Sequence, residues 1–212
     1  MKNTQKHFDV IVVGSGMSGG YAAKEFCEKG YQTLVLDRGK PLNHGQYKTE
    51  YLAPWQLPYR GKVLYQEAET KQFIQKKCYA FSDFTKQHFI DDQENPYQQK
   101  KPFDWIRSSS IGGKSLLWHR QSYRWCKLDF EANAADGHGI DWPIRYADIA
   151  PWYDYVEPFI GISGSIENLA ELPDGKFLPP LPLNSVEQGI KAKIDKNFPG
   201  RKMIPSRVAH LT

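Results

Sequence analysis

Two short apolar runs near the start of the chain flank a stretch with helical periodicity. The run FDVIVV at 8–13 is uninterrupted and β-branched, which is typical of a strand buried on both faces of a parallel sheet. Between residues 17 and 29, apolar side chains recur at helical spacing, and Gly30 supplies the C-terminal stop. The run YQTLVLD at 31–37 predicts a second strand. Together these patterns predict a strand, helix and strand in succession.

The hydrophobic pattern becomes irregular after residue 40. Residues 40–105 are rich in Pro, Tyr, Trp and Gln with little sustained periodicity, and we interpret them as a long covering segment. Within it, GKVLYQ at 61–66 predicts a strand and the polar stretch at 91–102 predicts an exposed loop. Helical spacing returns in KSLLW at 114–118.

Two further helices are predicted in the last third of the chain. After a Trp-Pro corner, Trp152, Val156 and Phe159 form an apolar stripe, which core packing of an amphipathic helix explains. A second helix is expected to begin at Ser185, with Gln188 completing a capping box.

Three glycines mark the turn between the first strand and the first helix. Gly14 permits the tight bend, Gly16 leaves space for a diphosphate against the backbone, and Gly19 lets helix and strand approach closely. The diphosphate would lie on the free N–H groups at the helix N-terminus. Asp37 ends the second strand, where its carboxylate can accept hydrogen bonds from both ribose hydroxyls of an adenosine. An acid there disfavours a 2′-phosphate, so FAD or NAD is expected rather than NADP.

A second turn of small residues follows the covering segment. Ser108, Ser109 and Ser110 lead into Gly112-Gly113, just before the predicted helix start. Two such turns suit a long cofactor such as FAD, whose diphosphate and flavin ends are both held at close range by the backbone. An NAD-dependent dehydrogenase domain remains an alternative, as does a nonenzymatic nucleotide-binding remnant.

Composition excludes several other classes of protein. The chain has 212 residues, 40% hydrophobic and 25% charged, which is ordinary globular composition. Its net charge of +4 is spread among both signs, so no nucleic-acid partner is expected. No apolar run is long enough for a transmembrane segment, and a strand beginning at Phe8 leaves no room for a signal peptide. We therefore expect a cytoplasmic protein, periplasmic only if exported with a partner. Cys27, Cys78 and Cys126 lack metal-ligand spacing and are expected to be buried, reduced thiols.

The sequence resembles the glucose-methanol-choline (GMC) flavoprotein oxidoreductases and, within them, the gluconate 2-dehydrogenase-like flavoprotein subunits. Three segments carry the resemblance, at 9–39, 108–120 and 136–164, and the third contains W-P-x-x-Y-x-D-I-x-P-W-Y. The resemblance implies an α/β fold with an incomplete Rossmann-like FAD-binding domain at 1–145, which includes the covering segment. The truncated beginning of an α+β substrate domain would follow at 146–212.

The resemblance also implies a set of cofactor-binding residues. The diphosphate and ribose would be held by Gly14, Ser15, Gly16, Met17, Ser18, Gly19, Asp37 and Arg38. The flavin ring and ribityl chain would be held by Ser110, Gly112, Gly113, Lys114, Ser115, Leu116 and Leu117. Asp37 stands where family members usually carry Glu. Leu117 stands where the related pyranose oxidases carry a flavin-linked histidine, so FAD is expected to be noncovalent.

The implied reaction is hydride transfer from the carbon of an alcohol, sugar or sugar acid to flavin N5, while a histidine base removes the hydroxyl proton. An electron-acceptor protein or a quinone would then take the electrons. In the family that base lies near the C-terminus of a much longer chain, so it is expected beyond Thr212. This chain is therefore expected to be an N-terminal fragment that is inactive alone.

Overall fold

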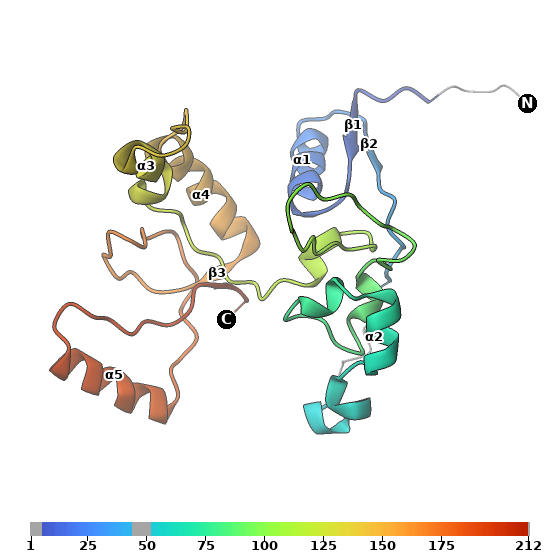
Figure 1. The fold of residues 1–212 in the computed structure, drawn as a ribbon. Helices are drawn as coiled ribbons and strands as arrows, with labels where there is room; N and C mark the ends of the chain where they lie inside the picture. The colour runs from blue at the N-terminus through green and yellow to red at the C-terminus, as the bar shows by residue number, and fades with distance from the viewer. Residues whose placement is uncertain (1–5, 44–51, 212) are drawn as a thin grey trace, which may run out of the picture. The chain divides into compact units, whose positions relative to one another are not determined.

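The computed structural model describes residues 6–43 and 52–211. The chain divides into two compact units, one ending at Trp118 and the other beginning at His119 (Figure 1). The predicted functional domains, with a boundary at residue 145, stay a prediction. Residues 44–51 of the predicted covering segment lie outside the described residues.

The first unit begins with the expected strand, helix and strand. Strand β1 spans Val10–Val13, helix α1 spans Met17–Glu28, and β2 spans Thr33–Leu36. The strands pair in parallel with Val10 opposite Thr33, which requires the helix to cross over between them (Figure 1). Gly30 adopts φ +87° directly after the helix, as its predicted role as a stop requires. The three predicted elements are confirmed.

The expected burial of both faces of the first strand is wrong. Val12 is 9% exposed and lies toward α1, where its Cγ1 is 3.3 Å from the Cβ position of Gly19. Its neighbours Ile11 and Val13 point to the other face and are 59% and 83% exposed. Among the described residues, the face of β1 that carries Ile11 and Val13 is therefore not covered by another layer.

The rest of the first unit consists of short helical turns. In the described part of this segment the α-helix is α2, Tyr65–Lys71. The 3-10 turns are η1 Pro54–Gln56, η2 Pro58–Gly61, η3 Gln75–Lys77, η4 Lys86–His88 and η5 Gly113–Leu116. The predicted strand at 61–66 is wrong, because Gly61 ends η2 and Tyr65 begins α2. The helix predicted at 114–118 is only the turn η5. The predicted loop at 91–102 is confirmed as irregular, although Asp92 within it is buried.

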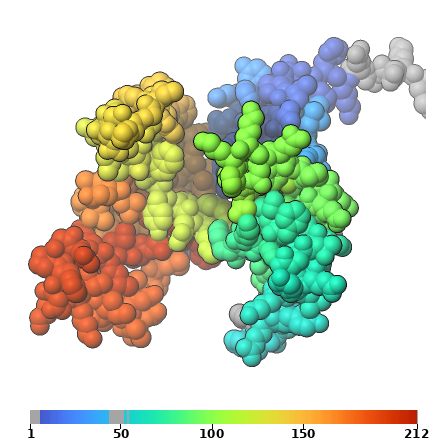
Figure 2. Space-filling model, in the orientation of Figure 1, coloured from blue at the N-terminus to red at the C-terminus, as the bar shows by residue number. Residues whose placement is uncertain are grey.

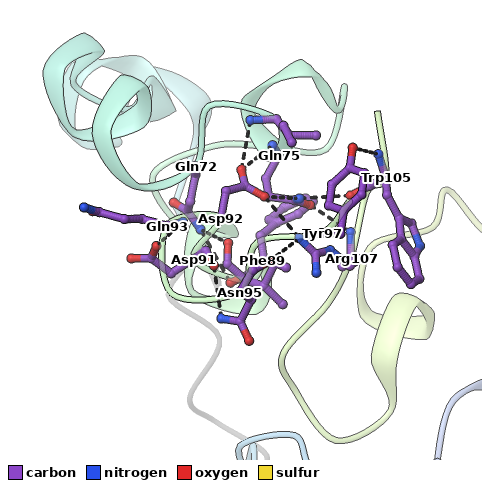
Figure 3. Close-up of polar contacts among 12 residues, drawn as sticks. Gln72, Gln75, Phe89, Asp91, Asp92, Gln93, Asn95, Tyr97, Trp105 and Arg107 are labelled. Carbon is purple, nitrogen blue, oxygen red and sulfur yellow. Dashed lines mark hydrogen bonds and ion pairs between the residues drawn. The ribbon is translucent and has the colours of Figure 1, made fainter. Parts of the chain in front are cut away.

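Buried polar side chains hold the irregular segment together (Figure 3). The side chain of Gln75 is fully buried, and its amide donates to Asp92 Oδ1 at 2.7 Å while its carbonyl accepts from the Arg107 backbone at 2.8 Å. Asp92 Oδ2 accepts from the backbone N–H groups of Ile74 and Gln75. These buried hydrogen bonds, and not a periodic row of apolar side chains, hold the segment in place. This explains why its sequence shows no hydrophobic periodicity.

The second unit contains three α-helices and a small antiparallel pair of strands (Figure 1). Helix α3 spans Lys127–Asp136, α4 spans Tyr146–Ile160 and α5 spans Ser185–Asn197. Strands β3, Ile162–Ser163, and β4, Val208–Ala209, pair antiparallel. Within the described residues, no helix combines the length and apolarity that crossing a membrane requires.

Two details of these helices correct the sequence analysis. In α4 the expected core residues Trp152 and Phe159 are 64% and 58% exposed, whereas Glu157 is buried. In α5 the N-cap is Asn184, whose side chain accepts from two backbone N–H groups at 3.0 Å, and Glu187 completes the capping box instead of Gln188.

Of the cysteines expected to be buried, Cys126 is buried, Cys78 is half-buried and Cys27 is exposed.

Candidate functional site

The three glycines of the first turn differ in what the protein itself requires of them. Gly14 adopts φ +92°, which side chains rarely adopt. A Cβ on Gly19 would lie 1.9 Å from the carbonyl oxygen of Gly14, so only glycine allows this approach of helix and strand. A Cβ on Gly16 would meet only Gly112 O, at 3.9 Å. Backbone conformation therefore explains Gly14 and close packing explains Gly19, whereas neither requires a glycine at position 16, which is free to serve a ligand.

The N-terminus of α1 is open to an anion. Gly16 is its N-cap and supplies no side-chain hydrogen bond, and the first turn contains no acidic residue. The first N–H groups of a helix have no partner within it, and the helix dipole places partial positive charge there. Met17 and Ser18, both exposed, contribute two of these groups. The free backbone N–H groups of this turn can therefore bind a phosphate.

Asp37 lies beside this turn and is held by the backbone around it. Its Oδ2 accepts from the hydroxyl and backbone N–H of Ser15 at 2.5 and 2.7 Å, and its Oδ1 accepts from the Gly39 N–H at 2.6 Å. The Ser15 hydroxyl is the main cause that lowers the pKa of this carboxyl group, followed by the two backbone bonds. Asp37 is therefore an exposed carboxylate at neutral pH, fixed in direction and able to accept further hydrogen bonds.

Ser15 joins the two glycine turns. Its hydroxyl donates to Asp37 and accepts from the backbone N–H of Gly112 at 2.9 Å, although Ser15 and Gly112 are 97 residues apart. A Cβ on Gly113 would lie 3.6 Å from Cα of Gly16. In Figure 2 the green segment around residue 110 lies against the blue atoms of the N-terminal part. The two motifs separated in the sequence thus form one surface.

The second turn is fixed by pairing with the chain that follows β2. The backbone N–H of Lys40 donates to Ser109 O at 2.7 Å, and Lys40 O accepts from the Ile111 N–H at 2.9 Å. A Cβ on Gly39 would lie 2.4 Å from the carbonyl carbon of Ser110. Sequence analysis missed the role of Gly39. The one clue in the sequence was its position, two residues after the acid that ends the second strand.

The other predicted residues lie around this surface with different roles. Ser115 donates to Gly112 O at 2.6 Å and so closes the second turn. Leu117 is buried, whereas Arg38 and Lys114 are exposed. Ser110 is buried and bonds to His88, a second residue that sequence analysis missed. Leu116 ends η5. The assignment of these side chains to a cofactor stays a prediction.

No family model matches the chain. It is 25% identical over 171 residues to 2-methyl-1,2-propanediol dehydrogenase of Mycolicibacterium austroafricanum, covering 78% of this chain and 26% of the relative. It is 24% identical over 193 residues to fructose dehydrogenase large subunit of Gluconobacter japonicus, covering 89% and 33%. Against gluconate 2-dehydrogenase flavoprotein of Pantoea cypripedii the identity is 26% over 179 residues, covering 77% and 26%.

The chain therefore spans between a quarter and a third of the length of these relatives. The resemblance inferred from the motifs is confirmed: this chain is similar, at low identity over most of its length, to oxidoreductases of the glucose-methanol-choline type.

Proposed function

We propose that this chain supplies the FAD-binding part of an oxidoreductase acting on the CH–OH group of a sugar, a sugar acid or a related alcohol. The observation that carries the proposal is the hydrogen bond from Gly112 to Ser15, which joins two glycine turns into one surface beside Asp37. A nucleotide alone needs only the first turn, and a longer cofactor uses both. The relatives are named as dehydrogenases, and one of them as a flavoprotein.

The residues of the first unit fit the proposed cofactor. Gly16 and the open N-terminus of α1 would receive the diphosphate, and Asp37 would accept from the ribose hydroxyls. The backbone of Gly112 and Gly113 would lie along the ring. Leu117 carries no group that could attach covalently, so binding would be noncovalent. When bound, FAD supplies the acceptor for a hydride from the substrate carbon.

The finer assignments belong to the same proposal. We propose a Rossmann-like domain at 1–145, the start of a substrate domain at 146–212, and a location in the cytoplasm. The electron acceptor would be a second protein or a quinone, since one relative is named as the large subunit of a dehydrogenase. No residue of this chain is assigned as the base that removes the hydroxyl proton.

A matched pair of glycine substitutions tests FAD binding. A Cβ has room within the protein at Gly16 and at Gly20, where the nearest atoms are 3.9 and 3.7 Å away. Only at Gly16 would the methyl group lie where the diphosphate is proposed. Gly16→Ala should therefore weaken FAD binding about tenfold or more, roughly 1.4 kcal/mol, and Gly20→Ala should leave it unchanged.

The measurement is the visible absorption spectrum of the purified chain after incubation with FAD and removal of the excess, followed by fluorescence titration. Equal affinities of Gly16→Ala, Gly20→Ala and the wild type would contradict the proposed site. Retention of NAD with no retention of FAD would favour a nicotinamide-dependent dehydrogenase instead.

A further inference from the structure

The three consecutive serines before the second turn all bond to the same short segment. Ser108 Oγ donates to the carbonyl oxygen of His88 at 2.8 Å, and Ser109 Oγ donates to that of Phe89 at 3.2 Å. Ser110 Oγ lies 3.1 Å from Nδ1 of the His88 ring. The backbone N–H of Ser109 adds a fourth bond, at 2.8 Å to His88 O. The serine run is thus explained by its attachment to His88 and Phe89.

His88 and its partner Ser110 are both buried in the first unit. His88 ends η4 and is 4% exposed, while Ser110 is 7% exposed. Figure 3 shows the neighbouring side of the segment, where the Gln72 amide also reaches the carbonyl oxygen of Phe89. Bonds from both sides therefore fix the backbone at this point, and the buried imidazole has the Ser110 hydroxyl as a hydrogen-bond partner.

The charges on the surrounding segments are bound elsewhere or exposed. They belong to Lys40, Lys71, Lys86, Asp91, Asp92 and Arg107. Lys86 forms ion pairs with Glu67 and Asp83. Asp92 accepts from Gln75 and lies 3.7 Å from Arg107. Among the described residues, none of these carboxylates is bonded to the His88 ring, so nothing offsets the cost of a buried imidazolium.

We infer that His88 is a positioning residue: its carbonyl oxygen and neutral ring hold Ser108 to Ser110 so that Gly112 and Gly113 lie against the first turn. Ser110 is two residues before Gly112, whose N–H bonds to Ser15. A shift at His88 would be passed through this short stretch to the joined surface. The inference deepens the proposed function and rests on it, because the group being positioned is the proposed FAD site.

Protonation of His88 provides a readout that simple packing would not give. Burial lowers the pKa of this imidazole below its usual value of about 6.5. Around and below that pH the unfolded or displaced segment binds more protons than the folded one, so the attachment is favoured at higher pH and weakens as pH falls. The affinity for FAD should follow the same direction.

The experiment compares FAD affinity between about pH 7.5 and about pH 5.5 in the wild type and in His88→Asn. Asparagine places an amide near the position of Nδ1, where it can bond to Ser110 but does not titrate. We expect wild-type affinity to fall measurably on acidification and that of His88→Asn to fall much less. His138→Gln, which replaces an exposed histidine, should behave as the wild type.

Each outcome decides one of the two proposals. If FAD is retained and His88→Asn shows the same pH profile as the wild type, the inference about His88 is wrong and the proposed FAD site stands. Should no variant retain FAD at any pH, the proposed function fails and the inference fails with it. If His88→Asn does not fold, NMR titration of the wild-type FAD complex decides: an ordinary histidine pKa for His88 overturns the inference, and a lowered one supports it.

Discussion

Replacing Arg124 by methionine should destabilise the second unit by about 3–5 kcal/mol, because it leaves the Glu157 carboxylate buried without its cation. The guanidinium donates to both oxygens of Glu157, at 2.8 and 2.6 Å, and the two side chains are only 4% and 8% exposed. After the substitution Glu157 keeps a hydrogen bond from the backbone N–H of Lys176, at 3.2 Å. Urea unfolding followed by tryptophan fluorescence measures the loss.

Two further variants separate the buried charge from general loss of packing. Arg124→Met combined with Glu157→Met removes both charges and should recover much of the lost stability. Lys127→Met removes an ion pair in which Lys127 Nζ lies 3.8 Å from a Glu131 carboxylate oxygen and the lysine side chain is 79% exposed. This substitution should lower the stability by less than about 1 kcal/mol. If Arg124→Met were as mild as Lys127→Met, the ion pair would not be what holds α4.

The same ion pair explains a glycine that no sequence pattern marked. A Cβ on Gly175 would lie 2.1 Å from Oε2 of Glu157 and 2.8 Å from a guanidinium nitrogen of Arg124. The backbone at 175 passes directly over the pair and covers it. Burial of Glu157 thus depends on a segment distant in the sequence, and an apolar stripe on α4 gave no sign of it.

Local signals predicted the first part of the fold correctly. The strand, helix and strand at 10–36 were recognisable because uninterrupted apolar runs, helical spacing and glycine positions all act within a few residues. Gly14 adopts the turn conformation and Gly19 makes the close approach that the motif predicted. Burial of the first strand was overestimated, because burial depends on which other segments cover the sheet, and no local pattern contains that.

Long-range pairing explains most of what the sequence did not reveal. His88 bonds to Ser110 across 22 residues, and Gly39 is required by the passage of Ser110 beside it. The run at 61–66 looked like a strand because its apolar residues are too few to distinguish a strand from the start of a helix. At the start of α5, Asn184 and Ser185 are adjacent and both are favourable N-cap residues, so the sequence pattern alone could not distinguish them.

Replacing Gly19 by alanine should destabilise the first unit by about 3 kcal/mol, because the added methyl group meets backbone that cannot move cheaply. Its Cβ would lie 1.9 Å from the oxygen and 3.0 Å from the carbon of Gly14, and 3.3 Å from Val12 Cγ1. Relieving the contact requires α1 to move away from β1, which also displaces the turn that carries Gly16. Hydrogen exchange of the peptides between residues 10 and 36 should therefore accelerate.

Gly20→Ala is the matched control in the next position of the same helix. Its Cβ would have ordinary contact, 3.7 Å from Ser15 O, and alanine is favoured over glycine in a helix by up to about 1 kcal/mol. Neighbouring substitutions of identical chemistry should thus change stability in opposite directions. Exchange in the second unit should be unaffected by both. Equal stability of Gly19→Ala and Gly20→Ala would mean that α1 and the first glycine turn are not in such close contact, and the tight strand-to-helix turn proposed to receive the diphosphate would lose its structural basis.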